Sequence, residues 1–339
     1  MPSAPLLSRA PIVDRLRRET YALPVDVFRL AAGALGLAYY VRTILEAGDI
    51  SHPDGFLDHD YLSDVFWFTR WSLFGTWLPY PVIQGAHYLA CLACIGLVVG
   101  FRPRLCAGIA YAINVSTYRW NFLVMYVDDA IMHLTFFWLL ILPTGRTLVL
   151  MEWFRDRGAA WQRWKREIVP GGTVSCFIGN LALLYLVAGL WKMTSPMWEE
   201  GIAVYATLRL PLSYAPEFWT LDYLPLLRFA NDFSLALEPL LPVAFLLRRG
   251  HPAKWVAFVA AFGFHVGIAT SLRVPYANIA CIAGWVLVLR HEIMDLLGAS
   301  RAARPLSWST KPPRRAKFAF VFLVVLTAAM LRRTPWIGT

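Results

Sequence analysis

The sequence predicts an all-α polytopic membrane protein, with about nine transmembrane helices and further amphipathic helices at the membrane interface. Of its 339 residues, 58% are hydrophobic and only 16% are charged, whereas a soluble domain carries about a quarter charged residues. Apolar segments close to the ~20 residues that cross a bilayer recur along the chain. In hydrocarbon only helices and closed barrels satisfy their backbone groups, and these segments are too long for barrel strands.

The positive charge of the chain indicates topology. The net charge of +10 comes from Lys and Arg residues in short clusters between the apolar segments. This pattern is typical of cytoplasmic loops, so nucleic acid is not an expected partner and the lipid bilayer is. Residues 1–24 contain four arginines and no apolar region before a cleavage site, which predicts a cytoplasmic leader.

The predicted spans follow one another with basic clusters mostly on the cytoplasmic side. They cover residues 25–46, 81–100, 105–119, 121–143, 174–193, 232–247, 254–271, 275–289 and 318–331. We therefore expect one transmembrane domain at 25–331 and a short tail at 332–339.

Three connecting segments are expected at the membrane surface. Residues 61–78 contain three tryptophans and predict a helix that lies in the outer interface. Residues 146–170 interleave basic and Trp residues at helical spacing, which predicts a cytoplasmic amphipathic helix on anionic lipid. The proline-containing segment 194–231 is expected to cap the outer face.

The five cysteines lie inside or at the edge of apolar segments. Their spacing fits neither a disulfide framework nor a zinc site, and no metal is predicted. Cys91 and Cys94 form a C-x-x-C one helical turn apart, which a redox protein can use. Burial of small thiols on a packing face is the commoner explanation.

Ionisable residues at one depth predict an outward-opening cavity. A charged group inside a span costs at least ~2.5 kcal/mol on insertion scales, so it usually faces the bundle interior. With a rise of ~1.5 Å per residue, Asp128 and Asp129 lie ~10 Å below the outer end of the fourth span. The other members lie at or just above this depth in four further spans: His87, Lys192, Glu238 and His265.

Each of these residues also has a purely structural interpretation. Lys192 ends its span and can extend to the interface as an anchor. His87 and His265 can be packing residues, and Glu238 can bridge backbone groups freed by Pro239. The adjacent carboxylates of the fourth span point to different helix faces, so both must be accommodated.

Several motifs come in a recognisable order and spacing. They are FRLAAGALGL from Phe28, VVGFRPRLCAG from Val98, LPTG from Leu142, AGLWKMTSPMWEEG from Ala188 and FGFHVGIA from Phe262. The most specific part is A-G-x-x-K followed six residues later by W-x-x-G. Over residues 28–289 the chain resembles the vitamin K-dependent gamma-glutamyl carboxylase and its bacterial relatives, the HTTM membrane proteins.

The resemblance implies a catalytic role for Lys192 as base or substrate-polarising cation, with Asp128 and His265 as its partners. It implies reduced, vitamin K-like quinone and oxygen as cofactors. The remaining cavity residues are expected to bind substrate: Asp129, Glu238, His87 and Trp198. Asp128 stands at or next to a catalytic histidine of the carboxylase, and the carboxylase's large outer domain is missing. Glutamate carboxylation itself is therefore not expected.

We expect an enzyme of the bacterial inner membrane, with a cytoplasmic N-terminus and an outward-facing site. Its substrate would be quinone-like, a lipid or a peptide. The alternative is a non-catalytic membrane factor for maturation or handling of a secreted peptide. A transporter ranks last, because the sequence has no internal inverted repeat.

Overall fold

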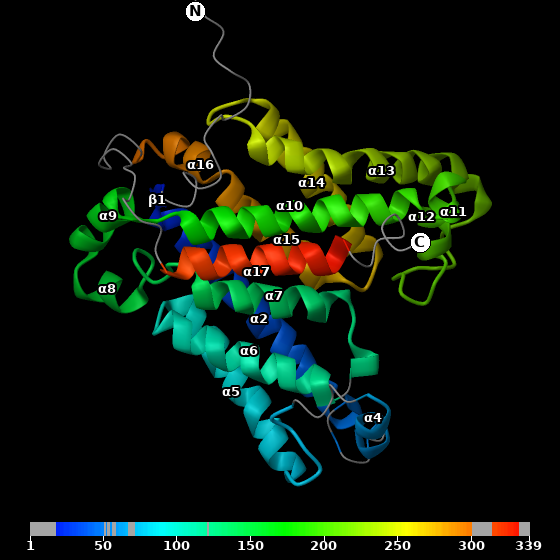
Figure 1. Ribbon diagram of the computed structural model, residues 1–339, viewed down its shortest axis with the longest axis horizontal. Helices are drawn as coiled ribbons and strands as arrows, with labels where there is room; N and C mark the ends of the chain where they lie inside the picture. The colour runs from blue at the N-terminus through cyan, green and yellow to red at the C-terminus, as the bar shows by residue number, and fades with distance from the viewer. Residues whose placement is uncertain are drawn as a thin grey trace, which may run out of the picture. The chain divides into compact units, whose positions relative to one another are not determined.

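The chain forms two compact units (Figure 1), one of Ala22–Glu167 and one of Met1–Tyr21 with Ile168–Thr339. The computed structural model describes residues 18–50, 52, 55, 59–66, 72–120, 122–299 and 314–331. Most of the predicted cytoplasmic leader and the whole predicted tail lie outside the described residues. Helices make up nearly all the regular structure in both units, which confirms the predicted helical class.

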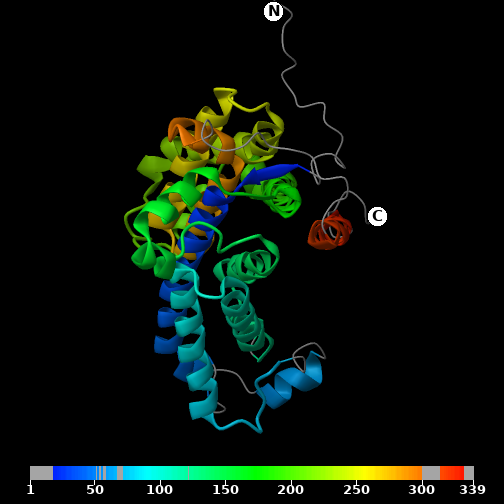
Figure 2. The same cartoon turned by 90° about the vertical axis from the view of Figure 1, so that its left-hand side faces the viewer.

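Helices packed largely in sequence order build the 22–167 unit. α2 packs against α5, α5 against α6 and α6 against α7, and Figure 2 shows α2 and α5 side by side. Their close approach depends on Gly33, where a Cβ would lie 2.8 Å from Leu97 Cβ. The elements are α2 (Ala22–Leu45), α3 (Ala47–Ile50), α4 (His59–Val65), α5 (Tyr80–Val99), α6 (Pro103–Trp120), η2 (Phe122–Val124), α7 (Val127–Ile141), α8 (Leu150–Arg155) and α9 (Arg157–Arg166).

A buried ion pair near the start of α2 holds the loop that follows α7. Asp26 Oδ1 lies 3.1 Å from Arg29 Nε, and both side chains are fully buried. The Asp26 carboxylate accepts backbone N–H bonds from Gly145 and Thr147, each at 2.6 Å. Arg29 donates to the Leu97 carbonyl oxygen at the end of α5. Because both charges are satisfied within the unit, this pair is structural.

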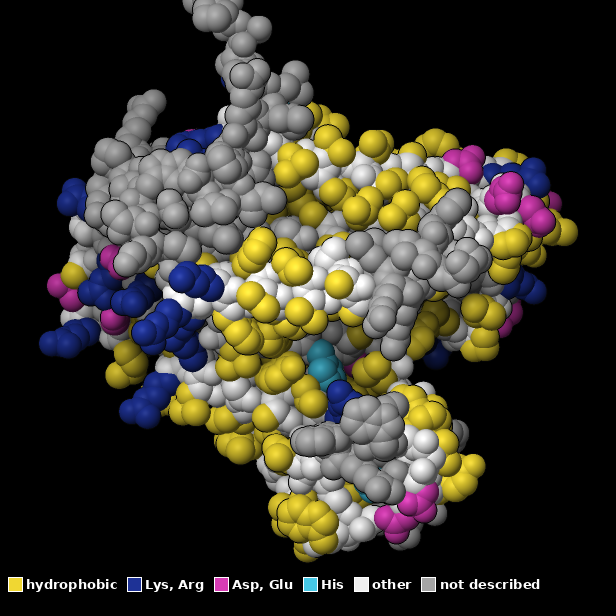
Figure 3. Space-filling view, viewed as in Figure 1, with side chains coloured by type: hydrophobic (Ala, Val, Ile, Leu, Met, Phe, Trp, Pro, Cys, Tyr) yellow, Lys and Arg dark blue, Asp and Glu magenta, His cyan; other side chains and the backbone are white. Residues whose placement is uncertain are grey.

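A short strand pair opens the second compact unit, which is called the 168–331 unit below although it also includes the strand at residues 19–21. β1 (Glu19–Tyr21) pairs antiparallel with β2 (Ile168–Pro170), and α10 then packs against α13, α15 and α17. Hydrophobic side chains cover much of the surface along α10 and α13 in Figure 3, as expected for helices that face lipid. The remaining elements are α10 (Gly172–Met193), α11 (Pro196–Glu199), α12 (Ala203–Leu208), η3 (Leu221–Tyr223), α13 (Leu224–Leu246), α14 (Ala253–Ser271), α15 (Pro275–Val288), α16 (Arg290–Leu296) and α17 (Arg314–Leu331).

Among the described residues, five helices and not nine are long and apolar enough to cross a membrane. They are Ala22–Leu45, Tyr80–Val99, Gly172–Met193, Leu221–Leu246 and Ala253–Ser271. α7 has 15 residues and α15 has 14, so each spans only ~21–23 Å of the ~30 Å hydrocarbon core. Polar residues such as Asn114 and Arg119 lower the hydropathy of α6. α17 begins with three basic residues. These four helices account for the difference from the predicted number.

Two predicted surface helices are shorter than expected. Within 61–78, α4 ends at Val65 and the described residues 72–78 form bends and one short turn, while residues 67–71 lie outside the described part. The helix predicted over 146–170 is divided into α8 and α9. Asp156 ends α8, and its side chain accepts the backbone N–H of Ala159 at 2.9 Å to cap α9.

The predicted outer cap at 194–231 contains α11, α12 and η3, and its last part belongs to α13. α13 begins at Leu224, earlier than the predicted start at residue 232. Pro225 is compatible with this start, because a backbone N–H in the first turn has no intrahelical partner. The sixth predicted span is therefore longer than the sequence indicated.

Candidate functional site

Lys192 lies among a carboxylate, a hydroxyl and two aromatic rings. Its Nζ is 2.7 Å from Glu238 Oε2 in an ion pair, and it donates a 2.7 Å hydrogen bond to Ser234 Oγ. Nζ is also 4.5 Å from the centre of the Trp198 ring and 5.4 Å from that of Phe264, within the range of cation–π attraction. The ammonium is thus directed toward α13 and α14 of its own unit.

Gly189 allows α10 and α13 to approach closely enough for this ion pair. A Cβ at Gly189 would lie 2.7 Å from Pro239 Cδ and 3.1 Å from Pro239 N. Lys192 follows one helical turn after Gly189, and Glu238 directly precedes Pro239. The glycine contact therefore places the two charged side chains next to each other, and this gives the A-G-x-x-K sequence a physical basis.

The W-x-x-G part of the motif shapes the chain after α10. The backbone oxygen of Trp198 in α11 accepts a 2.9 Å hydrogen bond from Asn231 Nδ2 of α13. Gly201 has a φ of 75°, a conformation that glycine adopts without the strain of other residues. The turn at Gly201 and the Asn231 contact hold the Trp198 ring beside the Lys192 ammonium.

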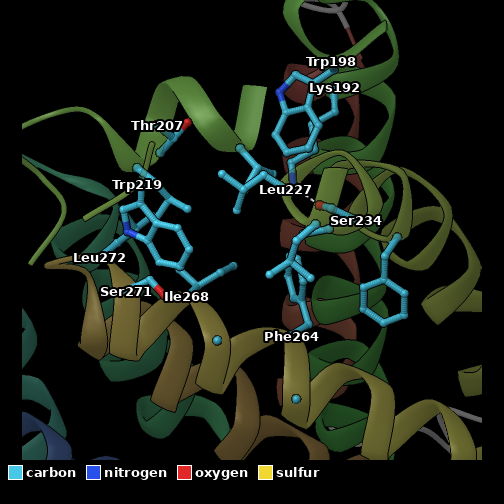
Figure 4. A pocket seen from close by; sticks show the side chains of 17 residues that line it. Lys192, Trp198, Thr207, Trp219, Leu227, Ser234, Phe264, Ile268, Ser271 and Leu272 are labelled. Atoms are coloured by element: carbon cyan, nitrogen blue, oxygen red, sulfur yellow. Dashed lines mark hydrogen bonds between the residues drawn. The ribbon is translucent and has the colours of Figure 1, made fainter. Parts of the chain in front are cut away.

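A cavity of about 480 Å³ opens beside Lys192 within the 168–331 unit (Figure 4). This volume is in the range of small-molecule sites. Apolar side chains dominate the described lining, and Lys192 is the one charged residue in it. In Figure 4 the side chains of Lys192 and Ser234 lie on one side of the cavity and Trp219 lies across from them. The cavity is therefore mostly apolar, with Lys192 and Ser234 at one end and the hydroxyls of Thr207 and Ser271 near Trp219.

Ser234 and the α14 wall of the cavity were not predicted from the sequence. Ser234 precedes Glu238 by four residues, so both lie on one face of α13. On α14, Gly263, Gly267 and Ser271 recur every four residues and line the cavity. A Cβ at either glycine would have no atom within 4 Å. These spacings are visible in the sequence, but small residues at helical spacing also mark ordinary helix packing.

His265 belongs to a buried hydrogen-bond chain in the same unit. Asn278 Nδ2 donates to the Val274 oxygen at 2.6 Å, so Asn278 Oδ1 accepts from His265 Nδ1 at 2.8 Å. His265 Nε2 then accepts from the Tyr185 hydroxyl at 2.7 Å, and that oxygen accepts from Trp285 Nε1 at 3.3 Å. Both ring nitrogens of His265 are engaged, while its neighbour Phe264 faces the cavity.

Asp128 and Asp129 lie in the interior of the 22–167 unit, in the first turn of α7. Asp129 Oδ1 accepts from the Tyr39 hydroxyl at 2.8 Å, and Oδ2 accepts from the Tyr126 backbone N–H at 2.6 Å. The second bond is half of a capping box at the start of α7. Asp129 therefore contributes to the folding of its own unit, whatever else it does.

His87 and the C-x-x-C cysteines also belong to the 22–167 unit. His87 is fully buried, and its Nε2 lies 3.0 Å from Thr117 Oγ1. Cys94 is buried and Cys91 is half-buried, and both are free thiols. Among the residues that the structure describes, no group of three or more His, Cys, Asp or Glu side chains is placed to hold a metal ion.

Of the predicted site residues, four are described together in the 168–331 unit: Lys192, Trp198, Glu238 and His265. The other three are described within the 22–167 unit: His87, Asp128 and Asp129. Comparison of the chain with protein-family models, with curated proteins and with solved structures gives no match. The candidate site therefore rests on its own geometry.

Proposed function

We propose that the chain is an enzyme of the bacterial inner membrane, with a core like that of the vitamin K-dependent carboxylase, that acts on an amphiphilic substrate at Lys192. One observation carries this proposal: an apolar cavity has a single ammonium group at one end. Such a cavity suits a molecule with an apolar body and one oxygen-bearing end. Five helices long and apolar enough to cross a bilayer support a substrate that enters from lipid.

Lys192 acts in this proposal as a cation that polarises a substrate oxygen. Glu238 Oε2 lies 2.7 Å from its Nζ, so the lysine is held in an ion pair beside the cavity. A preorganised donor next to a developing oxyanion typically contributes a factor of ~10²–10³ to the rate. Ser234 accepts a bond from Lys192, so its own hydroxyl proton remains for a contact with the substrate.

A reduced quinone fits the chemistry of the cavity. When bound, it supplies two electrons and two protons, which oxygen accepts to give quinone and hydrogen peroxide. Trp198, Trp219 and Phe264 offer aromatic walls for a ring, and Lys192 is placed to contact a ring oxygen. By the resemblance, Asp128 stands at or next to the position of a catalytic histidine of the carboxylase, so glutamate carboxylation is not part of the proposal.

The test uses the full chain in lipid nanodiscs, a reduced naphthoquinone and oxygen, with oxygen consumption as the readout. We expect Lys192→Ala to lower the rate by ~10²-fold or more, and Asp128→Asn tests the catalytic role expected for Asp128. The control is Lys254→Met combined with Glu292→Leu, which removes both partners of another ion pair in the same unit. It should keep the rate per folded molecule.

Absence of quinol oxidation, or a rate that Lys192→Ala leaves unchanged, contradicts the enzyme proposal. Saturable binding of a secreted peptide without turnover would favour the alternative of a non-catalytic membrane factor. Comparison of the Lys192 variant with the double control separates loss of the site from general destabilisation.

A further inference from the structure

Glu238 pairs with the charge of Lys192 but does not itself line the cavity. The cavity lining contains Lys192 and Ser234 but not Glu238, although Glu238 Oε2 lies 2.7 Å from Lys192 Nζ. The Glu238 side chain is 8% exposed and that of Lys192 is 21% exposed. The cavity therefore presents an ammonium group whose charge is already balanced.

We propose that Glu238 sets the charge selectivity of the cavity, so that it admits uncharged amphiphiles with a hydrogen-bond-accepting oxygen and excludes anionic ones. This inference rests on the proposed function only in taking the cavity as the substrate site. An anionic head would add a second negative charge beside one ammonium in a largely apolar wall, where an unpaired charge is costly. An uncharged oxygen incurs no such penalty.

The donors at the polar end define the chemistry of the ligand's head. Lys192 donates to Ser234 Oγ, and both the ammonium and the Ser234 hydroxyl are donors toward the cavity. The ligand atom they meet must therefore accept hydrogen bonds, as a ketone, ester, quinone or alcohol oxygen does. Beyond the head, the lining of α12, α13 and α14 is mostly apolar and suits a hydrocarbon or ring body.

The backbone fixes Glu238 in this role. A Cβ at Gly189 would lie 2.7 Å from Pro239 Cδ and 3.4 Å from Glu238 Cβ, so α10 and α13 are in direct contact at the pair. The contact keeps the Glu238 backbone within side-chain reach of Lys192. A bound anion would therefore have to compete with Glu238 for the same ammonium.

Equilibrium binding in lipid nanodiscs tests the proposal with two probes of similar chain length, radiolabelled hexadecan-2-one and hexadecanesulfonate. The wild type should prefer the ketone. Glu238→Gln leaves the ammonium unbalanced and should shift the affinity ratio at least about tenfold toward the sulfonate, equal to ~1.4 kcal/mol. Lys192→Met in the Glu238→Gln background should abolish the gain in sulfonate binding. Glu238→Asp and Glu292→Gln should keep the wild-type preference.

The inference is overturned if the folded Glu238→Gln protein keeps the wild-type ratio, or if the wild type already prefers the sulfonate. If Glu238→Gln does not fold, Lys192→Gln is tested in its place. This variant leaves the Glu238 carboxylate unbalanced, which should increase the preference for the ketone. A wild type that oxidises quinol but shows no change of ratio in these variants refutes the selectivity alone. A wild type that binds neither probe refutes both this inference and the proposed site.

Discussion

Among the described residues of the 168–331 unit, two lysine–glutamate ion pairs are buried to different extents, and they differ in what surrounds them. Lys192 and Glu238 join α10 to α13 at 2.7 Å, beside a hydroxyl, two aromatic rings and the cavity. Lys254 and Glu292 join α14 to α16 at 3.0 Å, and neither lines that cavity. Glu292 Oε1 also accepts the backbone N–H of Gly250 at 2.9 Å.

The comparison shows that burial of a charge pair does not by itself identify a site. Lys254 is 7% exposed and Lys192 is 21% exposed, so the more deeply buried pair is the one with purely structural contacts. Lys254 and Glu292 hold the turn at Gly250 against α16. Lys192 differs because a cavity lies beside it, and its ammonium and the Ser234 hydroxyl can donate hydrogen bonds into that cavity.

The largest expected effect is the loss of folding stability when Lys254 is replaced. Lys254→Met leaves Glu292 buried without its counterion, and such a change typically costs ~3–5 kcal/mol. Lys192→Met should cost less, because truncation beside the cavity lets water approach Glu238. Chemical unfolding in mild detergent measures both values. A larger loss for Lys192→Met would reverse the structural roles assigned to the two pairs.

A second prediction concerns the glycine contact beneath the Lys192 pair. Gly189→Ala places a Cβ 2.7 Å from Pro239 Cδ, and overpacking of this kind costs ~1–3 kcal/mol. It should also lower turnover, because it separates Lys192 from Glu238. Gly263→Ala is the matched control on α14, where a Cβ meets no atom within 4 Å. It should leave stability unchanged or raise it by up to ~1 kcal/mol. Equal losses of folding stability in Gly189→Ala and Gly263→Ala would contradict the proposed helix contact.

The smallest expected effect is a pH dependence next to the Lys254 pair. Burial, and then the charges of Arg290, Arg249, Lys254 and Arg18, hold the pKa of His291 well below its usual 6.5. Below pH 6.5 the unfolded chain therefore binds a proton that the folded chain excludes. Stability should fall by up to ~1.4 kcal/mol per pH unit as the pH decreases through this range.

His291→Gln should flatten that dependence between pH 7 and pH 5, measured as the thermal unfolding midpoint relative to wild type. If His291→Gln leaves the change of stability with pH as in the wild type, His291 does not cause that pH dependence.

The sequence predicted the helical class and helices apolar enough to cross a membrane, because composition is a local signal. A lysine at the end of an apolar run also made Lys192 a candidate site residue, and it lies beside a cavity. It did not predict the number of helices long enough to span, since α7 and α15 are apolar but short. Glu238 was expected at a substrate site, but its pairing with Lys192 depends on the Gly189–Pro239 contact between two helices.

Contacts between distant segments account for what was missed. Lys254 and Glu292 are 38 positions apart, and nothing in either segment indicates that they pair. Asp129 was expected at the substrate site, and the sequence did not indicate that its carboxylate caps α7 and accepts from Tyr39. The depth of a residue in a span does not show which neighbour will use its polar atoms.

The difference between the two pairs is tested most directly by lysine acetylation, followed by mass spectrometry with and without hexadecan-2-one. At a ligand concentration tenfold above the Kd, about nine in ten sites are occupied, so acetylation of Lys192 should slow about tenfold. Acetylation of Lys254 should not change. Equal acetylation of Lys192 with and without the ligand would contradict the assignment of Lys192 to a substrate cavity.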